Sequence, residues 1–178
     1  MMSQDEDTDF TSLRMLWTDQ PNYDPYIHLD PTYVRRMRVM EQALMDGDFK
    51  RAAKTCSRHY DRYFVDLGWN FFCLHSYSGL DDQERFGFHE FVFSGLLQSI
   101  KASGDGRSAE TAFKVISLTE EYGALNALRM TARRQSLITI DGIPYDKMEV
   151  VEEASGQTDV IYFNIMPIMT WLDQQFEG

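Results

Sequence analysis

Four histidines and the carboxylates near them are the residues of this chain best suited to acid–base chemistry. The stretch HEFVF at 89–93 begins like the helical zinc motif of metalloproteases, but Phe93 occupies the place of the second histidine. His59 and Asp61 are two positions apart, and side chains with that spacing on a helix do not face each other. A hydrolase would therefore need a dispersed set that only the fold could assemble: His59, His89, Glu90 and Asp105.

The glycine-rich stretch SGDGRS at 103–108 raises the question of a phosphate-binding loop. Such a loop normally follows a strand and opens a helix, so that backbone N–H groups face the anion. Here a helical pattern comes first and a strand pattern follows, and the Gly-Lys-Ser ending is missing. The stretch therefore indicates a helix-to-strand junction, in which Gly104 ends the helix with positive φ.

Basic residues form one coherent stripe at helical spacing: Arg51, Lys54, Arg58 and Arg62. The stripe could bind an acidic peptide or a phosphate, or it could be a solvated helix face. The stretch GDFKRAAK within it is similar to one turn and helix of a tetratricopeptide repeat, but there is no second copy at that period. A peptide-binding adaptor of that kind is one alternative function.

Acidic residues gather near the C-terminal end of the chain, with only Lys147 beside them. The group consists of Glu149, Glu152, Glu153 and Asp159. A local negative patch accelerates the encounter with a basic partner more reliably than it raises affinity. We therefore expect these residues to form a partner-binding surface at the rim or outer face of a sheet.

Cys56 and Cys73 are the only cysteines, and their spacing resembles neither a metal knuckle nor a nucleophile signature. Both lie in apolar surroundings, which predicts reduced, buried thiols of a cytoplasmic protein. The first ten residues are acidic and lack the apolar segment of a secretory signal, which supports the same location. No cofactor and no metal are expected.

The 178 residues carry a net charge of −11, with the acidic surplus in the first thirty residues and after residue 104. An acidic exterior repels phosphate backbones and anionic lipid, so nucleic acid and membrane are poor partners. There is also no apolar run long enough to span a bilayer. The charge favours a basic protein partner or simple solubility.

Helical periodicity dominates the first 103 residues. A capping pattern at Thr8 opens a short helix, and Asp30 followed by Pro31 opens a helix through Asp46. Asp48 caps the next helix. The apolar period predicts that this helix continues until Gly68 ends it, and a short helix follows over 69–77. The segment after Asp81 is apolar almost all round, which predicts a buried central helix.

Strand patterns follow Gly104. Residues 112–117 alternate, Ser117 and Glu120 have the spacing of a capping box for the next helix, and residues 135–165 form a three-stranded meander. Asp141–Gly142 predicts a two-residue hairpin turn, and Ser155–Gly156 marks the second turn. Alternation places Met148 and Val150 on the inner face, and the tail after residue 166 is helical.

The C-terminal half resembles a family of small bacterial proteins catalogued only as a domain of unknown function. The segments that carry the resemblance are SGDGRSAETAFKVISLTEEYGALNAL, DGIPYDKMEV and IYFNI, over roughly residues 99–165. The resemblance implies a bacterial source and a helical layer followed by a small sheet. It transfers no activity and no catalytic residue.

These patterns together predict a single α+β domain over 1–178. About five helices in a layer over 1–103 pack on a small, mainly antiparallel sheet over 104–178, with one crossover helix between its first two strands. The expected function is a non-enzymatic acidic protein that binds and masks a basic protein partner, such as an inhibitor or immunity protein of a bacterial toxin. The small hydrolase and the peptide-binding adaptor are the alternatives.

Overall fold

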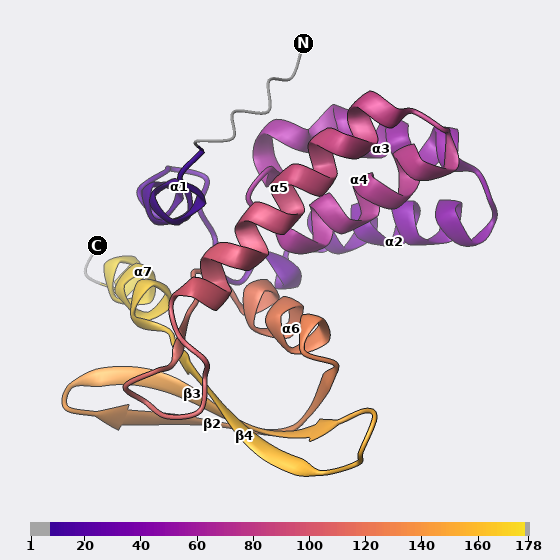
Figure 1. The fold of residues 1–178 in the computed structure, drawn as a ribbon. Helices are drawn as coiled ribbons and strands as arrows, with labels where there is room; N and C mark the ends of the chain where they lie inside the picture. The colour runs from indigo at the N-terminus through magenta and orange to yellow at the C-terminus, as the bar shows by residue number, and fades with distance from the viewer. Residues whose placement is uncertain (1–7, 177–178) are drawn as a thin grey trace.

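A computed structural model describes residues 8–176 of the chain. Residues 1–7, which belong to the acidic N-terminal segment, lie outside this range. Helices come first and a sheet follows, so the predicted α+β class is confirmed (Figure 1). In chain order the elements are α1 Phe10–Trp17, the 3-10 turn η1 Ile27–Leu29, α2 Pro31–Met45, α3 Phe49–Tyr63, α4 Leu67–Gly79, α5 Gln83–Ala102, β1 Phe113–Lys114, α6 Leu118–Ala127, β2 Met130–Ile140, β3 Ile143–Glu152, β4 Thr158–Asn164 and α7 Met166–Phe176.

Aspartates begin the N-terminal helices, because a carboxylate at the N-cap accepts hydrogen bonds from backbone N–H groups left free in the first turn. Asp30 and Asp48 cap α2 and α3 as predicted. The predicted cap at Thr8 is wrong, since Asp9 accepts the hydrogen bonds from the N–H groups of α1. Asp82 caps α5 in the same way.

The single helix predicted to end at Gly68 is in fact two helices. Helix α3 ends at Tyr63, and Asp66 then accepts a hydrogen bond from the Trp69 N–H at 2.6 Å and begins α4. Gly68 therefore lies in the first turn of α4 and is not a C-terminal glycine. The apolar period continues through the break, which is why the spacing predicted one helix.

The sheet has the strand order β1-β4-β3-β2. The meander of β2, β3 and β4 is antiparallel as predicted, and Asp141 and Gly142 join its first two strands with φ of 51° and 78°. The segment predicted as a strand over 112–117 forms only the two-residue β1, parallel to β4. Helix α6 connects β1 to β2, and Ser117 caps it by accepting from the Glu120 N–H.

Two apolar clusters hold the layers together. The first packs α5 and α6 on the inner face of the sheet, where Met148 and Val150 are fully buried as predicted. The second lies within α2, α3 and α4 around Trp69. The helices lie on one side of the sheet, with α6 between the sheet and the bundle of α2 to α5 (Figure 1). None of the described helices is long and apolar enough to cross a membrane.

The junction after α5 corrects one expectation. Gly104 is not among the glycines with positive φ, whereas Gly106 is, at 72°. Gly104 matters for a different reason: a Cβ at this position would lie 2.1 Å from the carbonyl oxygen of Thr111. The backbone of the loop therefore folds back against Gly104, and only a residue without a side chain allows that approach.

Candidate functional site

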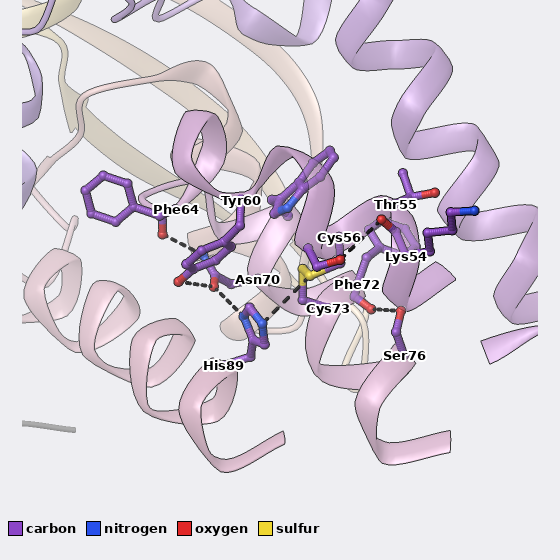
Figure 2. Close-up of a disulfide and its surroundings, with 12 residues drawn as sticks. Lys54, Thr55, Cys56, Tyr60, Phe64, Asn70, Phe72, Cys73, Ser76 and His89 are labelled. Atoms are coloured by element: carbon purple, nitrogen blue, oxygen red, sulfur yellow. Dashed lines mark hydrogen bonds between the residues drawn. A yellow bond between two sulfur atoms is a disulfide. The ribbon is translucent and has the colours of Figure 1, made fainter. Parts of the chain in front are cut away.

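His89 lies on α5 in a buried polar cluster with residues of α3 and α4 (Figure 2). Its Nδ1 is 3.1 Å from Oδ1 of Asn70. The amide nitrogen of Asn70 donates to the carbonyl oxygens of Phe64 and Asp66, at 2.7 and 3.0 Å. The Tyr60 hydroxyl also lies against Asn70 Oδ1, at 3.4 Å. These contacts fix the orientation of the Asn70 side chain, so that its oxygen faces the imidazole.

Cys56 on α3 and Cys73 on α4 form a disulfide beside this histidine (Figure 2). The prediction of two reduced thiols is therefore wrong in this structure. Both cysteines are fully buried, as expected, and the sulfur of Cys56 lies 3.7 Å from Nε2 of His89. The sequence gives no signal for the pair because the two residues are 17 positions apart on different helices.

The imidazole of His89 is neutral and held in place by aromatic rings. Burial lowers the pKa of His89 to about 4. The ring stacks on Tyr77 with an interplanar angle of 6°, and Tyr60 meets it edge to face at a centroid distance of 4.9 Å. His89 also lines an open pocket of about 510 Å³ whose rim carries the basic side chains of Lys50, Lys54 and Arg85.

The fold does not assemble the dispersed hydrolytic set. Among the described residues, no hydrogen bond or ion pair joins any two of His59, His89, Glu90 and Asp105. His59 lies near the indole of Trp69, with ring centroids 6.4 Å apart, whereas Glu90 is exposed on α5. Asp105 accepts hydrogen bonds from Thr111 and Arg107 within its own loop.

A large apolar groove of about 860 Å³ lies where the helical bundle meets α6. Its walls come from η1, α2, α4, α5 and α6. The lining residues are mainly apolar and include Met37, Leu67, Phe71, Phe72, Phe93, Leu97, Leu118 and Tyr122. Phe71 and Tyr122 remain 43% and 47% exposed. A mostly apolar concavity of this size with a few polar groups is the usual form of a ligand site.

Asp66 holds three walls of the groove in fixed positions. Its carboxylate accepts hydrogen bonds from the Tyr33 hydroxyl of α2, the Trp69 N–H of α4 and the Thr119 hydroxyl of α6, at 3.0, 2.6 and 3.2 Å. Burial raises the pKa of the Asp66 carboxyl, although these three donors act against the rise. The groove is therefore a preformed feature of the fold.

His28 on η1 supplies an unsatisfied polar atom in the groove wall. Its Nδ1 is buried without a hydrogen-bond partner among residues 8–176. Burial lowers the pKa of His28, so the imidazole is neutral at pH 7. Buried polar atoms are normally hydrogen-bonded, and a molecule in the groove could supply the missing partner.

The predicted acidic surface also contains basic side chains, which come from other segments of the chain. Glu149 lies directly opposite Arg134 on β2, and Asp159 forms an exposed ion pair with Arg107 at 3.4 Å. By strand alternation, Glu149 faces outward, whereas Asp159 pairs with the inward-facing Val150. Glu152 and Glu153 lie together where β3 enters the second turn, which contains Gly156 with positive φ.

The basic stripe lies along the exposed face of α3. Arg51, Lys54, Arg58 and Arg62 are all exposed. Arg62 forms an ion pair of 3.7 Å with Asp30. Arg58 and Arg62, together with Arg36 of α2, also contribute to the lowered pKa of His59, after the larger effect of burial.

Buried charges that the sequence reasoning did not identify lie where α6 meets the other elements. Arg14 of α1 is buried and donates to both carboxylate oxygens of Glu120, to Ser99 of α5 and to the Lys114 carbonyl of β1. These contacts join four elements through one guanidinium group. The two glutamates at 120 and 121 resemble ordinary first-turn acids in the sequence, so no local pattern distinguishes them.

Glu121 and Asp146 form a second buried carboxyl pair, between α6 and β3. Burial, followed by the charge of Asp146, raises the pKa of Glu121 to about 9. At neutral pH Glu121 is therefore protonated, and neither of its carboxyl oxygens has a hydrogen-bond partner among residues 8–176. Asp146 accepts a hydrogen bond of 2.6 Å from the side-chain amide of Gln135. Neither carboxyl group lines any of the five pockets, which include the groove and the pocket beside His89.

The family model described as "Domain of unknown function (DUF4919)" matches residues 4–173. The chain therefore belongs to this family, and the match extends well beyond the segments that carried the resemblance in the sequence. No curated protein and no solved structure has a significant match to the chain.

Proposed function

We propose that this protein is a non-enzymatic binding protein whose site is the apolar groove between α2, α4, α5 and α6, and that its ligand is a protein partner. The observation that carries the proposal is the groove itself, of about 860 Å³ and held open by the hydrogen bonds of Asp66. The half-exposed rings of Phe71 and Tyr122 at this site are of the kind that concentrate binding energy in protein interfaces.

The partner is a basic protein that inserts apolar side chains into the groove. The net charge of −11 on this protein supports a positively charged partner, because complementary charge accelerates the encounter of two proteins. An inhibitor or immunity protein of a bacterial toxin is a protein of this class. The bacterial source and the cytoplasmic location stay predictions, and a cytoplasmic protein would carry the Cys56–Cys73 pair mainly in its reduced form.

The test compares two tryptophan substitutions. Ala127→Trp fills the groove, whereas Ala154→Trp places the same ring in the exposed β3–β4 turn, which lines no part of it. Each purified variant and the wild type are immobilised and exposed to lysate of the source organism, and captured proteins are quantified by mass spectrometry. Circular dichroism confirms that all three are folded.

We expect one basic protein to be captured stoichiometrically by the wild type and by Ala154→Trp. Capture by Ala127→Trp should fall about tenfold or more, because loss of a central contact costs about 2 kcal/mol or more. Equal capture by the wild type and both variants would exclude the groove. A wild type that retains only a small molecule would exclude a protein partner.

A further inference from the structure

Three buried side chains outside the groove present donor atoms to one point. The ligand atoms of Cys56, Cys73 and His89 all lie within 4.8 Å of one another. Two thiolates and one imidazole are ligands that zinc prefers. We propose that the reduced cysteine pair and His89 bind a Zn²⁺ ion, and that the disulfide is the metal-free form of the same site. This differs from the expectation of no metal and is independent of the proposed function.

The tautomer of His89 follows from the hydrogen bonds of Asn70. The Asn70 amide nitrogen donates to the backbone carbonyls of Phe64 and Asp66, so its Oδ1 is left as an acceptor for His89. Figure 2 shows the contacts of Asn70 with Phe64 and His89. Nδ1 of His89 must therefore carry the hydrogen. With the hydrogen on Nδ1, Nε2 is the ring nitrogen that can bind a metal through its lone pair, and it faces the sulfur of Cys56. Zinc-binding histidines are commonly oriented by a partner on the other ring nitrogen in this way.

The oxidised site leaves this lone pair unsatisfied. Neither sulfur of a disulfide carries a hydrogen, and Cys56 is the only hydrogen-bond neighbour of Nε2 within the described part of the chain. A buried acceptor without a donor is unfavourable. A Cys56 thiol would donate to Nε2, and a zinc ion would accept the lone pair directly, so the reduced states satisfy the histidine better than the disulfide does.

The observed separation fits shared coordination. A tetrahedral zinc with bonds of about 2.3 Å to sulfur and about 2.05 Å to nitrogen places those two ligand atoms about 3.6 Å apart. Cys56 Sγ and His89 Nε2 are 3.7 Å apart. Two thiolates bound to one tetrahedral zinc lie about 3.8 Å apart, a distance that the two sulfurs can adopt once the disulfide is reduced.

Three protein ligands leave one tetrahedral position for water. His89, on one side of the site, also lines a pocket of about 510 Å³. Two thiolates neutralise the charge of Zn²⁺, so the ion brings no net charge into the buried site. The neighbouring rings of Tyr60 and Tyr77 hold the imidazole in place while the sulfurs move.

The chemistry balances with a dithiol as the reductant. The dithiol transfers two electrons and two protons to the Cys56–Cys73 bond, which becomes two thiols, and the dithiol closes to its own disulfide. Zinc then displaces one proton from each thiol and binds both thiolates and Nε2. In the reverse direction a disulfide is the oxidant: exchange re-forms the Cys56–Cys73 bond, reduces that disulfide to two thiolates and releases the ion, so the thiol–disulfide balance of the compartment would decide whether the site is loaded.

Cobalt substitution tests the site on the full-length protein. The chain is reduced with a phosphine, which does not compete for the metal, and titrated with Co²⁺ without oxygen. We expect a thiolate-to-cobalt charge-transfer band and the visible bands of tetrahedral cobalt, saturating at one equivalent and displaced by Zn²⁺. The oxidised protein should show neither band. Zinc should also protect both cysteines of the reduced protein from alkylation.

Matched histidine variants assign the third ligand. His89→Gln should weaken cobalt binding by about tenfold or more and alter the spectrum, whereas His75→Gln, on the neighbouring helix, should leave both unchanged. If reduction unfolds the chain, Zn²⁺ should restore its helical circular dichroism. The proposal is overturned if the reduced wild-type protein binds no cobalt and regains no structure with zinc. It is also overturned if the oxidised protein binds cobalt as well as the reduced protein does, or if His89→Gln binds cobalt as the wild type does.

Discussion

Glu121→Gln is expected to stabilise the protein at neutral pH, although it removes a charged residue type from the core. Burial holds the pKa of Glu121 at about 9 against an ordinary value of 4.5, so the folded state keeps a proton that the unfolded state loses. The stability contributed by that proton is fully present below about pH 4.5 and is lost as the pH rises through 9. Wild-type stability should therefore fall across this range.

The size of the expected change in stability follows from the shift in the pKa of Glu121. At pH 7 the pH lies about 2.5 units above the pKa of the unfolded carboxyl, and each unit corresponds to about 1.4 kcal/mol, which gives about 3.5 kcal/mol. Glutamine needs no proton. Like the carboxyl that it replaces, its amide has no hydrogen-bond partner among the described residues, and the additional donor costs about 1 kcal/mol. The net gain is about 2.5 kcal/mol, or about 5–10 °C in Tm for a chain of this length.

Urea unfolding of the wild type and Glu121→Gln at pH 5, 7 and 8.5 measures this directly. The difference between the two proteins should grow with pH, and contributions from titrating groups that do not interact with Glu121 cancel in that difference. A difference that does not change with pH, or a variant less stable than the wild type at pH 8.5, would refute the reasoning.

Three further predictions concern stability. Arg14→Met leaves Glu120 charged and buried, so it should cost about 3–5 kcal/mol and be visible in a thermal melt; a loss below about 1 kcal/mol would contradict the buried ion pair. Gly104→Ala should cost about 1–3 kcal/mol in urea unfolding, because its Cβ would meet the Thr111 oxygen; an unchanged stability would contradict the close approach at Gly104. Neutralising Glu149, Glu152, Glu153 and Asp159 together should leave the Tm nearly unchanged, since exposed ion pairs contribute little, and a large change would give these residues a structural role.

Local patterns predicted much of the fold. Asp30, Asp48 and Ser117 cap their helices because a side-chain oxygen and the first turn are all that the interaction needs. Asp141–Gly142 forms the hairpin turn because positive φ is a property of those two residues. The sequence does not predict the break between α3 and α4, because the apolar spacing runs through it. Asp66, which begins α4, is held by hydrogen bonds from α2 and α6, and local spacing does not show these partners.

The candidate sites are harder to predict because they depend on distant contacts. The groove draws its lining from five elements, and each contributes residues that also suit an ordinary core. Asn70 orients His89 only because Phe64 and Asp66 present carbonyl groups at the same place. The predicted acidic surface shows the reverse problem: its residues are close in sequence, but Arg134 and Arg107 from other segments reach two of them.

Hydrogen–deuterium exchange of the protein with and without its captured partner tests the binding groove most directly. The partner should slow exchange in α4, Leu67–Gly79, and in α6, Leu118–Ala127, which form facing walls of the groove. The second turn and the ends of β3 and β4 should exchange at unchanged rates. Protection confined to residues 149–159, with α4 and α6 unaffected, would contradict the groove as the binding site and return the partner to the acidic surface.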